Sequence, residues 1–173
     1  QIIDDVLGAD SLHPWLRLRL VEAATEGPAS TEDDADERTL WGHGDRVGER
    51  AGQWARAVGL PESLVEDLVT AGRHHDDGKA DPRMQAALGA AVDESGFLLL
   101  EEPRQRERRR PLSKSRLPRR YWNRSMRMAG VPSGWRHEAA SADRLEEQLE
   151  KGEQTAHDPD LVMHLVLSHH GRF

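Results

Sequence analysis

The stretch Ala71–Lys79, which reads Ala-Gly-Arg-His-His-Asp-Asp-Gly-Lys, decides the fold expected for this chain. Residues at helical spacing lead up to each of three consecutive positions. The stripe before His75 consists of Leu64, Leu68 and Ala71, and the stripe before Asp76 of Val65, Val69 and Gly72. Both are apolar and should face the core. The stripe before His74 consists of Ser63, Asp67 and Thr70; it is polar and should face water. A buried imidazole and carboxylate need a partner, so the alternatives are a divalent metal ion and a hydrogen bond between His75 and Asp76.

Composition limits the chemistry that this site can use. The chain has 173 residues, enough for one domain with a real core. It has no cysteine, so a metal must be held by His, Asp and Glu. No signal peptide or membrane span is visible, and we therefore expect a cytoplasmic location. Because β-branched residues are sparse and Ala, Leu, Glu and Arg abundant, the sequence favours an all-α fold.

The chain divides at the end of an acidic stretch. Residues 1–38 are expected to form an N-terminal segment that ends in a surface loop rich in acids, Glu32–Glu37. Residues 39–173 are expected to form the functional part of one globular domain. The sequence opens on Gln1 rather than Met, so we expect a piece of a longer protein.

The first expected helix runs from about Asp45 to Gly59. Asp45 suits its N-cap, and His43 lies one turn before the apolar stripe on the same face, which consists of Val47, Ala51, Trp54 and Val58. His43 is therefore either an inward-facing metal ligand or a capping and packing residue.

The helix that carries the central stretch is expected to open at Pro61 and to stop at Gly78. A short helix should then run from Pro82 through Leu88. Asp77 points off the expected ligand face and suits solvation or capping. Lys79 either neutralises a phosphate beside the ligands or is an ordinary surface lysine.

A basic segment follows an irregular stretch between residues 91 and 112. Eleven of the 24 Lys and Arg residues lie between Arg104 and Arg127, against the single acid Glu107, although the net charge is −7. Aromatic residues beside arginines suit a single-stranded nucleic acid, and the alternative is a solvated basic loop. The candidate contacts are Arg108, Arg109, Arg110, Lys114, Arg119 and Arg120.

Two further helices end the chain, and each places histidine at the end of a stripe. A helix beginning at Ser133 or Gly134 carries His137 one turn before Ser141 and Leu145. The last helix has Asp158 as its cap, Pro159 in its first position and Gly171 after its end. Its two apolar stripes end at His169 and His170, and His164 is expected in the core or behind the ligands.

Six residues at helix ends therefore close apolar stripes: His43, His75, Asp76, His137, His169 and His170. Six such ligands exceed one tetrahedral site. They suit two metal ions roughly 3.5–4 Å apart, with the two oxygens of Asp76 between them.

This constellation resembles the HD superfamily of metal-dependent phosphohydrolases. More narrowly, it resembles the HD nuclease domain of the CRISPR-associated helicase-nuclease of type I systems. The resemblance runs from about Leu40 to the end of the chain and preserves motif order: His43, then His-Asp-Asp-Gly-Lys at 75–79, Arg-His-Glu at 136–138 and His-His-Gly at 169–171. It implies a helical HD bundle, here with an irregular basic insertion.

The resemblance also implies an activity, namely hydrolysis of phosphodiester bonds in single-stranded DNA during CRISPR interference. His43, His75 and Asp76 would hold one divalent transition-metal ion of the manganese, iron, nickel or cobalt class. Asp76, His137, His169 and His170 would hold a second, and Lys79 and Arg172 would screen phosphate charge. The implied partners are an RNA-guided surveillance complex and a helicase, whose ATPase motif is missing here.

The family also closes its site with an aspartate well after the His-His pair, and no aspartate follows His170 in this sequence. Two other readings stay open: an HD nucleotidase or cyclic-dinucleotide phosphodiesterase, and a degenerate HD module that binds DNA or a protein partner without catalysis.

Overall fold

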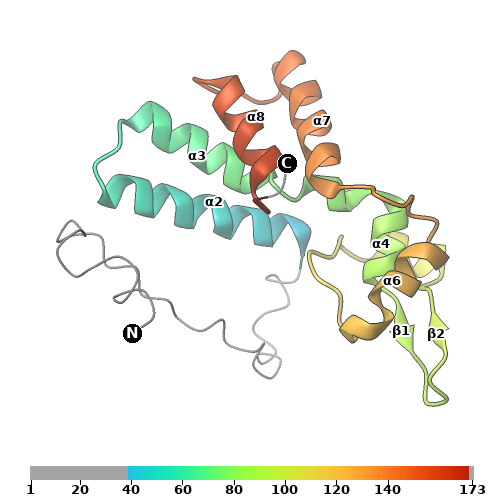
Figure 1. The fold of residues 1–173 in the computed structure, drawn as a ribbon. Helices are drawn as coiled ribbons and strands as arrows, with labels where there is room; N and C mark the ends of the chain where they lie inside the picture. Colours follow the sequence, from blue (N-terminus) through green and yellow to red (C-terminus); the bar gives the residue numbers. More distant parts are fainter. Residues whose placement is uncertain (1–38, 172–173) are drawn as a thin grey trace, which may run out of the picture. The chain divides into compact units, whose positions relative to one another are not determined.

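The structure is a computed structural model that describes residues 39–171, so the expectations for residues 1–38 and for Arg172 lie outside the described part. This part is mostly helical (Figure 1), as the all-α expectation requires. Its elements are α2 (Leu40–Ala57), α3 (Glu62–His74), the 3-10 helix η2 (Asp77–Ala80), α4 (Pro82–Leu88), β1 (Ala91–Val92), β2 (Leu98–Leu99), α5 (Pro103–Arg108), α6 (Arg119–Met128), α7 (His137–Glu150) and α8 (Pro159–Ser168). Within residues 39–171, no helix is both long and apolar enough to cross a bilayer.

Helices α2 and α3 lie side by side (Figure 1), and a row of glycines on α2 forms their contact. Gly44, Gly48 and Gly52 are buried and spaced one turn apart. A Cβ built on Gly48 would lie 2.8 Å from the backbone oxygen of Val69, and one on Gly72 would lie 2.8 Å from the Cα of Gly48. The two backbones therefore approach each other too closely for any larger residue.

This packing corrects the expected apolar stripe of α2. Trp54 is 65% exposed and Val58 is 74% exposed, because the helix buries its small face instead of its large apolar one. The helix also begins five residues earlier than expected. Its N-cap is Thr39, whose side-chain oxygen accepts a hydrogen bond from the amide of Gly42 at 3.1 Å, so Asp45 lies inside the helix and is not the cap.

The main core lies between α3, α7 and α8. Its buried members are Ala71, Ala142, Leu145, Val162 and Val166, and Leu149 packs against them. The stripes expected on the last two helices therefore do face the core. His164 is an exception, since it is exposed rather than buried.

The chain leaves α3 earlier than expected, at His74 rather than at Gly78. Gly78 is instead a buried residue of η2, where its amide donates to the hydroxyl of Ser141 on α7 at 2.8 Å. A side chain at this position would collide with the backbone carbonyl of His137. Gly78 thus brings the His-Asp turn close to the start of α7.

The segment from residue 91 to 127 is more regular than expected. Strands β1 and β2 pair antiparallel, with Ala91 opposite Leu99. Two short helices follow, α5 within the first part of the basic segment and α6 at its end. Helix α6 packs beside α4, as Figure 1 shows. The expected irregular basic insertion is therefore irregular only between the end of α5 and the start of α6.

Candidate metal centre

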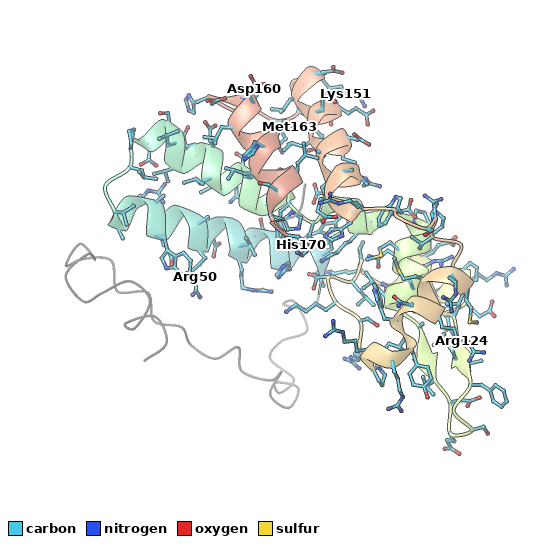
Figure 2. All side chains as sticks on the ribbon, in the orientation of Figure 1. Arg50, Arg124, Lys151, Asp160, Met163 and His170 are labelled. Carbon is cyan, nitrogen blue, oxygen red and sulfur yellow. The ribbon has the colours of Figure 1, made fainter. Side chains whose placement is uncertain are left out.

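Five histidines gather around the carboxylate of Asp76, at the place where helix ends converge. His43 comes from the first turns of α2, and His137 is the first residue of α7. The adjacent residues His169 and His170 follow the last residue of α8. Figure 2 labels His170 at this convergence of α2, α3, α7 and α8. His75, which follows α3, is the fifth histidine. The structure therefore brings together Asp76 and the five histidines that were expected to bind metal.

The two oxygens of Asp76 face different histidines. Oδ2 lies 3.3 Å from Nε2 of His75 and 3.6 Å from Nε2 of His43. Oδ1 lies 3.1 Å from Nε2 of His137 and 3.6 Å from Nε2 of His169. Ligand atoms that share a metal at about 2.1 Å are separated by roughly 3.0–3.4 Å, and these spacings come close to that range.

Two groups of side chains lie close enough together to hold a metal ion. One consists of His43, His75 and Asp76, and the other of Asp76, His137, His169 and His170; within each, the ligand atoms lie within 4.8 Å of one another. These are the two sets that the family resemblance implies, and Asp76 belongs to both.

Backbone carbonyls fix the orientation of two of the rings. Nδ1 of His75 lies 2.7 Å from the carbonyl oxygen of Gly72, and Nδ1 of His169 lies 2.8 Å from that of Val166. A carbonyl only accepts, so each Nδ1 donates, and in its neutral form each ring turns the lone pair of Nε2 towards Asp76. Carbonyls behind metal-binding histidines usually play this part.

Two buried polar atoms at the centre lack a hydrogen-bond partner in the described part of the chain. They are Nε2 of His169 and Oδ1 of Asp76. Buried polar atoms normally have partners, and two facing acceptors repel unless a cation or proton lies between them. The donor set thus fits a divalent metal ion.

The carboxylate of Glu138 supports His137 from behind. Its Oε2 lies 3.4 Å from Nδ1 of His137, and its Oε1 accepts a hydrogen bond from Arg136 at 3.2 Å. Burial would raise the pKa of Glu138, but its own backbone amide, His137 and Arg136 hold that pKa below the usual value. The sequence expectation did not assign this role, although the Arg-His-Glu triplet itself was the signal.

The electrostatics of the cluster keep Asp76 ionised. Burial opposes ionisation, yet the imidazoles of His137, His169 and His75 and the ammonium of Lys79 hold its pKa well below the usual range. Burial lowers the pKa of His43 more than Asp76 raises it. For His169 the balance is opposite, because the carboxylate of Asp76 and a backbone carbonyl outweigh burial and raise its pKa.

The ammonium group of Lys79 contacts the carboxylate of Asp76. Its Nζ is 2.6 Å from Oδ2 of Asp76, the oxygen that faces His43 and His75. The side chain of Lys79 is only 15% exposed, so it is not an ordinary surface lysine, and its positive charge lies next to the carboxylate of Asp76.

Two members of the neighbouring polar stripe, Asp67 and His74, do not face water, contrary to expectation, whereas Ser63 at its start is exposed. The side chain of His74 is only 15% exposed, and its Nδ1 lies 2.7 Å from Oδ2 of the buried Asp77. Asp67, earlier in the same helix, is also buried. Its carboxylate oxygens accept hydrogen bonds from the backbone amides of His157 and Asp158 at 2.7 and 3.0 Å. Asp67 thus anchors the start of α8, and His74 closes the His-Asp turn.

The candidate nucleic-acid contacts fall into two groups. Arg108, Lys114, Arg119 and Arg120 are exposed, and Arg110 is exposed as well. Arg109 instead makes internal contacts, since its Nε donates to Glu101 at 2.7 Å and its guanidinium also contacts Gln85. These contacts leave Arg109 poorly placed to meet a phosphate.

Comparison of the chain with protein families, with curated proteins and with solved structures finds no match. The residues and geometry described above are therefore the basis on which a function can be assigned.

Proposed function

We propose that residues 39–173 form an HD-type domain that hydrolyses phosphodiester bonds in single-stranded DNA with the help of two divalent transition-metal ions. The observation that carries the proposal is the position of the Asp76 carboxylate between two sets of histidines. One oxygen faces His43 and His75, and the other faces His137 and His169. A single carboxylate between two sets of imidazoles is what a pair of neighbouring metal ions needs.

Each of the two groups of side chains would hold one metal ion. His43, His75 and Asp76 would hold one ion, and Asp76, His137, His169 and His170 the other. Bound there, such ions supply Lewis acidity towards a phosphoryl oxygen and a hydroxide nucleophile at neutral pH. The charge of Lys79 beside Asp76 supports its role in neutralising phosphate, as charge-assisted contacts do.

The choice of a single strand as substrate depends on the basic segment. Helix α6 presents exposed arginines, including Arg124, which Figure 2 labels on this helix, and the half-buried Tyr121 and Trp122 lie among them. A guanidinium of this helix, that of Arg120, lies 4.9 Å from the ring centre of Tyr121. Cations with aromatic rings between them suit phosphates and unstacked bases.

The resemblance to the type I nuclease domain extends the proposal to partners. A helicase domain or subunit would supply the strand, and an RNA-guided surveillance complex would expose it. The activity would then serve CRISPR interference in the cytoplasm.

The test combines metal analysis with a cleavage assay. Purified protein is loaded with Mn²⁺, Co²⁺, Ni²⁺ or Fe²⁺ and given a single-stranded oligonucleotide, a mononucleotide and a cyclic dinucleotide. Cleavage of the oligonucleotide by wild type, and not by Asp76→Asn, is the expected result. Turnover of only the small substrates would indicate a nucleotidase or cyclic-dinucleotide phosphodiesterase, and DNA binding without turnover would indicate a degenerate module.

A further inference from the structure

The side chain of Gln85 on α4 is buried, and all of its hydrogen-bonding capacity is used. Its Nε2 donates to the carbonyl oxygens of Lys79 at 2.8 Å and of Leu112 at 2.9 Å. Its Oε1 accepts from the amide of Leu112 at 2.8 Å and from Arg109 at 3.0 Å. An amide side chain has two donor hydrogens and two acceptor lone pairs, so no further bond is possible.

These partners belong to two separate parts of the fold. Lys79 ends the His-Asp-Asp-Gly-Lys motif, while Leu112 belongs to the loop between α5 and α6. Leu112 also forms an isolated β-bridge with Thr39, and the carbonyl of Pro111 accepts the amide of Leu40 at 2.7 Å. Gln85 therefore joins the metal-binding turn, the basic loop and the start of α2, which carries His43.

The loop pinned in this way presents one basic side chain at the edge of the centre. Ser113 is buried immediately after Leu112, and the next residue, Lys114, is exposed. Two residues before Lys114, Leu112 bridges to Thr39, whose carbonyl oxygen accepts the amide of His43 at 3.0 Å. Lys114 therefore follows closely on a stretch of the loop that is bound to the helix turn carrying His43.

We propose that Gln85 is a positioning residue, which fixes residues 109–116 against the His43 side of the centre so that Lys114 meets the phosphate backbone of a bound strand. This inference rests on the proposed function and adds the element that aligns the substrate. Gln85 itself touches neither substrate nor metal. Its effect should therefore appear in substrate affinity rather than in metal content.

The test uses Gln85→Met, which keeps the length of the side chain and removes all four bonds. Its matched control is Gln105→Met, at an exposed position of α5. Two measurements are made on the full chain. Trypsin cleavage after Lys114 and Arg116 reports whether the loop is anchored, since the bond after Arg110 is protected by Pro111. Steady-state cleavage of single-stranded DNA separates KM from kcat.

We expect Gln85→Met to be cut by trypsin faster than wild type and to raise KM about 3- to 10-fold, the effect expected for removing one charge-assisted hydrogen bond to phosphate. Metal content and kcat should stay near wild type. Lys114→Ala should raise KM similarly, and the double variant should add little, because a freed loop no longer places the lysine. Gln105→Met should change neither measurement.

Gln85→Glu serves if the methionine variant does not fold. It keeps both acceptor contacts but sets an oxygen against the carbonyl oxygens of Lys79 and Leu112, so its trypsin rate and KM should also rise above the wild-type values. Faster trypsin cleavage with unchanged KM would overturn the positioning role, and so would unchanged trypsin cleavage in both variants. If wild type cuts no DNA, the proposed function fails, whereas the anchoring is still decided by trypsin.

Discussion

Nε2 of His169 lies 3.6 Å from Oδ1 of Asp76, and both atoms are buried without a hydrogen-bond partner in the described part of the chain. Because Nδ1 of His169 donates to a backbone carbonyl, the neutral ring faces the carboxylate with a lone pair. A proton or a metal ion on Nε2 relieves this repulsion, so the two must compete for the same atom.

This competition predicts a pH dependence of metal binding. The raised pKa of His169 means that the ring keeps its proton to a higher pH than an ordinary histidine, while the lowered pKa of His43 leaves that ring neutral at pH 7. Affinity for Mn²⁺ should therefore fall as the pH falls from 8 to 6, by up to tenfold per unit for each proton displaced. Calorimetry in buffers of different ionisation enthalpy measures the protons released, and an affinity independent of pH would contradict the competition.

The bond between His74 and Asp77 predicts a loss of stability on mutation. His74→Ala leaves the buried carboxylate of Asp77 without its imidazole partner, which should lower the free energy of unfolding by about 1–3 kcal/mol. Urea denaturation measures this change. The double variant His74→Ala/Asp77→Ala is the control, because it should cost less than the sum of the two single changes. Strict additivity would show that the pair does not interact.

The glycine row of α2 predicts that a larger residue at its centre is harmful. Gly48→Leu should lower the free energy of unfolding by about 1–3 kcal/mol or more, because the added atoms meet the backbone of α3. Gln53→Leu, at an exposed position of the same helix, should change stability by less than about 0.5 kcal/mol. Equal stability of the two variants would contradict the close approach of the helices.

The exposed basic side chains predict the salt dependence of DNA binding. Replacing Lys114, Arg119 and Arg120 by Gln should weaken binding and lower the log–log salt slope by about 0.7 for each phosphate that is no longer neutralised. Fluorescence anisotropy over a range of salt concentrations gives the slope. Arg109→Gln is the comparison, since its contacts with Glu101 and Gln85 should make it cost stability instead. An unchanged slope in the triple variant would assign the segment another role.

The sequence patterns indicated several of the residues that meet at the centre, but His43 was placed by a stripe whose members Trp54 and Val58 are exposed. Periodicity placed His137, His169 and His170 at the ends of stripes that do face the core, and Gly171 does adopt a positive φ of 63° after α8. Helix ends are local features, and their caps and glycines are visible in the sequence.

Contacts between distant segments could not be predicted from local patterns. The burial of Gly48 in place of Trp54 depends on how closely α3 approaches, which periodicity alone does not contain. Asp67 resembles a surface residue until the amides before α8 are brought against it. Gln85 was missed for the same reason, since its partner Leu112 lies 27 residues away along the chain.

The proposed bridging of two metal ions by Asp76 is tested most directly by titrating the protein with Mn²⁺ and recording its electron paramagnetic resonance spectrum. Two ions bridged by one carboxylate at roughly 3.5–4 Å should give the multiline spectrum of a coupled pair, with two equivalents bound per chain. Asp76→Asn should lose the coupled spectrum while circular dichroism shows the helices retained. A wild-type spectrum with only the six lines of isolated Mn²⁺ at every ratio would contradict the bridging role of Asp76.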